Sequence, residues 1–117
     1  MDQKPLIWLV GIQCRPEDEA KFIHWYDEIH VPMLLKGHHV SRVRRFKLAD
    51  ETYQVGATTA PCPNYLTIYE FADQARFDAW MASPARAEAG EDKQATWAEH
   101  PYEVRWATRY DLATAWS

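Results

Sequence analysis

The chain has 117 residues, 47% of them hydrophobic, and a formal net charge of −4. This length suits one domain over residues 1–117, and the composition is far from that of a disordered chain. Acidic and basic residues are interspersed, which excludes the extended basic surface of a nucleic-acid-binding protein, and no apolar run reaches the ~18 residues of a membrane-spanning helix.

The two cysteines, Cys14 and Cys62, are far apart and form no CxxC pair. A disulfide between them is allowed but not required, so we expect a reduced chain in the cytoplasm. The apolar run at residues 6–12 is short and no small-x-small cleavage site follows it, which argues against a signal peptide.

The N-terminal third of the chain is expected to hold one strand and one helix. The apolar run Leu6–Ile12 predicts a strand buried on both faces, and Pro16 with the acidic residues after it favours a helix N-terminus. The helix face expected to meet the sheet carries Phe22, Trp25, Tyr26 and Ile29, and the opposite face carries Lys21, His24 and Glu28. Asp27 and His30 lie between these faces. Pro32 is expected to end the helix, or residues Met33–Lys36 add one more turn before Gly37.

The rest of the chain alternates between strand and helix patterns. We expect a strand over Val40–Leu48, a strand over Tyr65–Phe71, helical sequence from Asp73 to about Trp97, and a strand over Tyr102–Leu112. Asp73 and Ser83 are placed to cap two helical segments, the second with proline in its first turn.

This β-α-β-β-α-β order predicts an α+β, ferredoxin-like protomer. Its four-stranded antiparallel sheet would carry both helices on one face and leave the other face bare. Because the first and third strands are apolar on both faces, that bare face would expose an apolar patch in a monomer. A homodimer that packs sheet against sheet would bury it.

The pattern Trp25-Tyr26-Asp27-x-x-His30-x-Pro32, with Leu66–Phe71 before Phe77-Asp-Ala-Trp80 and then Ser83-Pro84, resembles the EthD-like family of the dimeric α+β barrel superfamily. The resemblance implies a barrel between two protomers and a pocket in each, between sheet and helices. Relatives include cofactor-free oxygenases, isomerases, decarboxylases, lyases, haem-degrading enzymes and accessory proteins of catabolic pathways. The haem-degrading branch carries its haem-ligating histidine in the second helix, and Phe77–Trp97 contains none, which counts against haem. Because the sequence also has no Gly-rich nucleotide loop and no flavin fingerprint, we expect no cofactor.

His30, which matches the motif histidine of that family, is the leading catalytic candidate. Its imidazole can take or give a proton near neutral pH. Asp27 and Tyr26 lie about one helical turn earlier, so Asp27 is expected to orient the ring and Tyr26 to donate to a substrate oxygen. The alternative is a structural histidine that bonds the last carbonyls of the helix.

A second group of side chains is expected to line a flat apolar pocket for a small aromatic molecule. These substrate-binding candidates are Trp8, Phe46, Arg44, Tyr69, Trp80 and Trp106. Arg44, or its neighbour Arg42, would bind a carboxylate or phenolate if its strand face meets the helices. The alternative for the aromatic residues is the core and the dimer interface.

The histidines between positions 24 and 39 lack the i, i+4 pair of a helical zinc site, so we expect no metal. Either His38 or His39 could still reach toward His30, and the sequence leaves that open.

These features favour a cofactor-independent enzyme, a lyase or isomerase, that acts on a small aromatic or polycyclic catabolic substrate by histidine acid/base catalysis. The alternatives are a cofactor-free monooxygenase, a non-catalytic ligand-binding accessory protein of a degradation pathway, and a structural dimer without a pocket.

Overall fold

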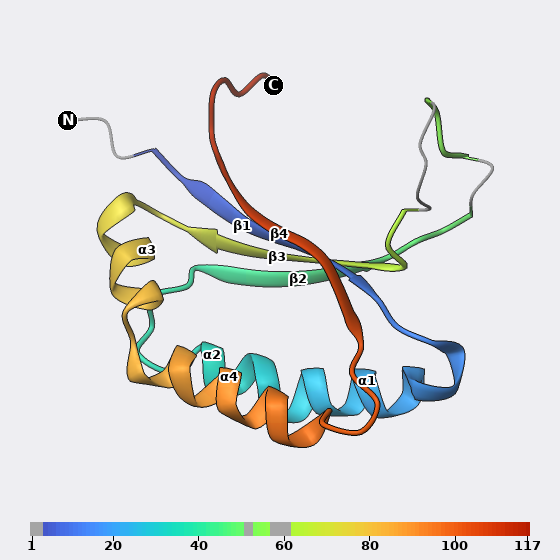
Figure 1. The fold of residues 1–117 in the computed structure, drawn as a ribbon. Coiled ribbons are helices and arrows are strands. Elements are labelled where there is room, and N and C mark those ends of the chain that lie inside the picture. Colours follow the sequence, from blue (N-terminus) through green and yellow to red (C-terminus); the bar gives the residue numbers. More distant parts are fainter. Residues whose placement is uncertain (1–3, 51–52, 57–61) are drawn as a thin grey trace.

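Four strands form one antiparallel sheet in the order β2-β3-β1-β4. The computed structural model describes residues 4–50, 53–56 and 62–117. The strands are β1 (Leu6–Gln13), β2 (Arg42–Lys47), β3 (Tyr65–Phe71) and β4 (Glu103–Asp111). The α-helices are α1 (Glu19–Trp25), α2 (Val31–Leu34), α3 (Gln74–Met81) and α4 (Pro84–Thr96). Figure 1 shows the helices as a layer against one face of the sheet, which confirms the ferredoxin-like βαββαβ prediction.

Strand β3 defines the two faces of the sheet, because successive side chains of a strand point in opposite directions. Its four buried residues pack toward the helices: Tyr65, Thr67, Tyr69 and Phe71. The residues between them, Leu66, Ile68 and Glu70, lie on the opposite face, which we call the outer face. The register continues this face onto β2, where Phe46 pairs with Leu66 and Arg44 with Ile68.

The helix that follows β1 runs through Pro32 rather than ending there. Between α1 and α2 the chain forms one widened π turn, Tyr26–His30, in which the N–H of Val31 donates to the carbonyl of Tyr26, five residues earlier. In a uniform α-helix the ring of Pro32 would collide with the carbonyl four residues before it. The wider turn precedes that position, and Val31 keeps helical angles (φ −63°, ψ −45°). The prediction that His-x-Pro ends the helix is therefore wrong.

The widened turn also changes which side chains face the sheet. A turn that holds an extra residue rotates everything after it relative to ordinary helical spacing. Ile29, predicted to be in the core, is 40% exposed, whereas His30 is only 9% exposed. Phe22, Trp25 and Tyr26 precede the shift and are buried as predicted.

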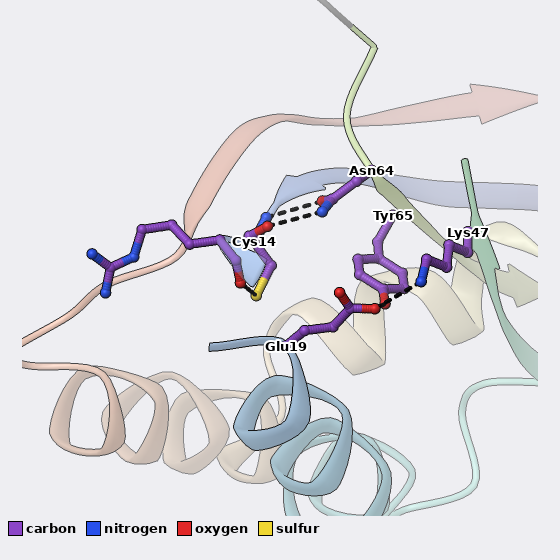
Figure 2. A network of polar contacts seen from close by, with 6 residues as sticks. Cys14, Glu19, Lys47, Asn64 and Tyr65 are labelled. Atoms are coloured by element: carbon purple, nitrogen blue, oxygen red, sulfur yellow. Dashed lines mark hydrogen bonds and ion pairs between the residues drawn. The ribbon is translucent and has the colours of Figure 1, made fainter. Parts of the chain in front are cut away.

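Polar contacts fix the start of this helix against the sheet (Figure 2). The Cys14 backbone N–H donates to the Asn64 side chain, whose amide donates back to the Cys14 carbonyl, both at 2.9 Å. The Glu19 carboxylate accepts from the Tyr65 hydroxyl at 2.6 Å and from Lys47 Nζ at 2.8 Å. Burial, aided by nearby carboxylates, raises the pKa of the Cys14 thiol to about 11, so this cysteine stays protonated and structural.

Gly11 is required where β1 meets a tryptophan of β4. It lies opposite Trp106 in the register, and a Cβ built on Gly11 would lie 2.7 Å from Cε2 of that indole.

We expect Gly11→Ala to lower the free energy of unfolding by about 1–3 kcal/mol through overpacking. In a Trp106→Ala background most of that loss should disappear, which a double-mutant cycle in urea would measure. Equal losses in both backgrounds would contradict this account.

Candidate active site

A cavity of about 270 Å³ lies between the sheet and the helices. Its walls come from β1, β3, β4, the π turn, α2, α3 and α4. Five of the predicted site residues line it: His30, Tyr26, Trp8, Tyr69 and Trp80. The chain thus brings the motif histidine and four aromatic candidates together in one place.

His30 occupies the cavity wall as a neutral imidazole. Its ring stacks on Trp25, with centroids 4.4 Å apart, and its buried Nδ1 has no hydrogen-bond partner among the described residues. Burial, with a further contribution from the charge of Lys93, lowers the pKa of His30 to about 4 despite the opposing effect of Asp92. Since the helix continues past this residue to Leu34, His30 is not a helix-terminal cap, which removes that alternative.

Three tyrosines line the same cavity as the histidine, and their hydroxyl groups are neutral. The Tyr26 and Tyr69 hydroxyls are hydrogen bonded at 2.9 Å, and Tyr102 lines the same cavity. Burial raises the pKa of all three. The bond between Tyr26 and Tyr69 uses one of their two hydroxyl protons, so the pair retains one proton to donate elsewhere.

Asp27 does not orient His30. Its side chain is half exposed and its carboxylate accepts from Arg45 Nη1 at 2.6 Å. Asp27 immediately follows Tyr26 in the π turn and points to the edge of β2 instead of the cavity. The predicted Asp27–His30 pair is therefore corrected: the histidine has no carboxylate partner on its buried nitrogen.

The remaining predicted binding residues lie on the outer face and do not line the cavity with His30. Arg44 and Phe46 lie opposite outer-face residues of β3 in the register. The Arg44 guanidinium forms an ion pair with Glu70 at 3.2 Å. Trp106 lies beside Gly11 on the same face. His38 is exposed and His39 is half-buried, and neither lines the cavity.

Sequence reasoning missed the contribution of α4. Arg86, Lys93 and Tyr102 line the cavity together with the small residues Ala89 and Gly90. The available signal was the i, i+3, i+4, i+7 spacing of the α4 residues, which places them on one helix face. Because α4 is rich in alanine and its charges are scattered, its sequence does not show which helix face turns toward the sheet.

Residues 4–50, 53–56 and 62–117 contain no cluster of three or more His, Cys, Asp or Glu arranged to hold a metal ion. Within the same ranges no helix combines the length and apolarity needed to cross a membrane.

Comparison with known protein families assigns the chain to one of them. A family model described as a domain of unknown function, DUF4286, matches residues 5–105, and the chain belongs to that family. None of the proteins with curated functions matches the sequence.

Solved structures then confirm the fold. An EthD family protein from Bacillus halodurans is 15% identical, with 92% of this chain and 99% of that chain covered and a TM-score of 0.61. A dimeric protein of unknown function with a ferredoxin-like fold from Bacteroides fragilis is 14% identical (96% and 100% covered, TM-score 0.61). SnoaB, a cofactor-independent oxygenase from Streptomyces nogalater, is 11% identical (100% and 97% covered, TM-score 0.58). The ferredoxin-like fold that the resemblance to the EthD-like family implied is thus confirmed.

The buried histidine predicts a specific dependence of stability on pH. Because the pKa of His30 falls from 6.5 to about 4 on folding, the unfolded chain takes up a proton there first as the pH drops. The free energy of unfolding should therefore decrease between those two values. From pH 7 to pH 5 the wild type should lose about 2 kcal/mol more than His30→Gln in urea titrations. His24→Gln, an exposed histidine of the same helix, should keep the wild-type dependence, and an identical loss in all three proteins would refute the burial argument.

Proposed function

We propose that this chain is a cofactor-independent enzyme that acts on a small aromatic or polycyclic compound by proton transfer at His30. The observation that carries the proposal is a neutral imidazole without a carboxylate partner in the wall of an aromatic cavity. Trp8 and Trp80 offer ring surfaces for a flat ligand. The tyrosine pair supplies a hydroxyl donor close to the histidine ring, whose centroid lies 5.0 Å from that of Tyr26.

The proposed step moves a proton from a weakly acidic O–H or C–H of the substrate to His30. The electron pair of that bond stays on the substrate as a phenolate or enolate, which the Tyr26–Tyr69 hydroxyl pair stabilises by donation. Return of the proton to another carbon completes an isomerisation. Expulsion of a leaving group from the neighbouring carbon completes an elimination, so both predicted reaction classes, isomerase and lyase, share the same first step.

A pKa of about 4 makes His30 a weak base. A bound anion would favour the imidazolium, because an opposite charge within a few ångströms stabilises the charged form. The histidine is therefore expected to become a more effective base when a substrate whose negative charge develops next to the ring is bound.

A cofactor-free monooxygenase is the second candidate. The similarity in fold to SnoaB, itself a cofactor-independent oxygenase, favours it. The same first step would yield an electron-rich anion, with molecular oxygen as the oxidant. Oxygen consumption during turnover separates this reaction from the isomerase and lyase, and binding without turnover would indicate an accessory protein.

We expect His30→Gln to lower kcat by about 10²–10⁴-fold, because general base catalysis is lost while the side chain keeps a similar length and polarity. Turnover would be followed for a substrate found by screening phenols and naphthols. The dissociation constant for that substrate and the melting temperature at pH 7 should change little. His24→Gln is the matched control, and retained turnover in His30→Gln would remove the histidine from the mechanism.

The outer face supports a homodimer. Ile7, Leu9, Leu66 and Ile68 form a half-buried apolar surface flanked by the more exposed Phe46 and Trp106. A monomer would leave this face to water, and the similar protein from Bacteroides fragilis is described as dimeric. We therefore propose that two copies pack sheet against sheet.

Light scattering during size exclusion should give twice the chain mass of 13.7 kDa. Leu9→Lys places a charge at the centre of the outer face, opposite Ile68, and is expected to give the monomer mass. Met81→Lys, at an exposed apolar residue of α3, should remain dimeric. A monomer mass for the wild type would contradict the proposed assembly.

A further inference from the structure

Helix α4 presents a regular face to the cavity. Arg86, Ala89, Gly90 and Lys93 line it at i, i+3, i+4 and i+7. The two cations are two helical turns apart, about 10 Å along the axis. The residues between them are the smallest available, and a Cβ added to Gly90 would meet nothing within 4 Å. The helix therefore leaves open space between two positive charges.

Among the described residues neither cation has an acidic partner, in contrast to many other cations there. Arg15, Arg42, Arg45, Lys47, Arg76 and Arg109 all pair with carboxylates. The Arg86 guanidinium instead lies 5.1 Å from the ring centroid of Trp80, and Lys93 Nζ lies 5.0 Å from that of Tyr102. Aromatic faces hold both groups in place without neutralising them.

The cavity wall itself supplies no carboxylate. None of its lining residues is an aspartate or glutamate, although the chain has 17 acidic residues against 13 basic ones. Asp92, the neighbour of Lys93, accepts from Trp25 Nε1 at 2.8 Å and does not line the cavity. Two half-buried cations thus share a cavity with neutral groups only, and a ligand with a negative charge would complement both.

We propose that Arg86 and Lys93 form the anion-binding side of the cavity, and that its ligand is an aromatic compound carrying a carboxylate or an ionised phenol. The planar guanidinium of Arg86 suits a carboxylate through two parallel hydrogen bonds. The Lys93 ammonium is the cation whose charge acts on His30. It is therefore placed to stabilise a phenolate or enolate oxygen when the proton leaves the substrate.

This inference rests on the cavity being the ligand site proposed above, and it narrows the substrate class to aromatic acids, particularly those with a hydroxyl beside the carboxylate. A neutral aromatic hydrocarbon would leave both cations without a counter-charge. The ring system would lie beside Gly90, where the helix carries no side chain and a Cβ would meet nothing within 4 Å.

The test compares 1-hydroxy-2-naphthoate with its neutral amide, 1-hydroxy-2-naphthamide, by titration calorimetry at pH 7 and low salt. The wild type should bind the acid about 10-fold to 100-fold more tightly, as expected for charge-assisted hydrogen bonds. In the Arg86→Gln/Lys93→Gln double variant the two compounds should bind within about 3-fold of each other. Lys21→Gln is the matched control, since Lys21 lies over the ring of Trp97 but outside the cavity.

The variant Gly90→Leu tests whether the two compounds bind in the cavity. It fills the open space next to α4, so both compounds should lose affinity while the melting temperature is kept or raised, because leucine is a better helix former than glycine.

Three results would overturn the inference. Equal affinity of acid and amide in the wild type would remove the anion requirement and leave the proposed aromatic ligand site standing. Preference for the acid that survives in the double variant would place the anion at other residues. Failure of both compounds to bind would count against the cavity as a ligand site and so against both proposals.

Discussion

The geometry of the site depends on the widened turn at Tyr26–His30. A proline at position 32 is incompatible with uniform α-helical packing against the carbonyl four residues earlier, and the π turn lets the helix continue to Leu34. The extra residue in that turn rotates His30 inward and Ile29 outward. Without it, the standard helical spacing would place an isoleucine where the imidazole now lies. π turns of this kind occur often at functional sites.

The turn also explains the electrostatic state of the histidine. In a π turn, residues five apart come into register, and His30 stacks on Trp25. This contact buries the ring and leaves Nδ1 without a protein partner. Since Asp27 is engaged with Arg45, only the charge of Asp92 offsets part of the lost hydration. The result is a neutral imidazole in the wall of a cavity that Arg86 and Lys93 also line.

The sequence predicted the strands, the helix caps at Asp73 and Ser83, and the ferredoxin-like topology because each has a local signal of its own. It also identified His30, Tyr26 and three further cavity residues from the motif and the aromatic content. The first wrong prediction concerns the two faces of β2. Its alternating side chains define two faces, but they do not show which face meets the helices. Arg44 and Phe46 were therefore placed in the wrong layer.

The second failure has a different cause. Arg86 and Lys93 were not predicted to line the cavity, because cations on an alanine-rich helix are ordinarily solvated. Their role depends on which face of α4 meets the sheet, and that follows from packing across the cavity instead of from local pattern. The side chains that face the sheet after Tyr26 could not be predicted either, because a fixed period of 3.6 residues does not allow for one wider turn.

The central claim is that the fold holds His30 as a neutral, unpartnered imidazole in the cavity wall. An NMR titration of the histidine rings, with the His30 signal assigned from its absence in His30→Gln, measures this directly. The account predicts a ring that stays neutral well below pH 6 and titrates with a pKa near 4 in the unliganded protein. A pKa at or above the ordinary value of about 6.5 would show a solvated or carboxylate-paired ring and would contradict the account.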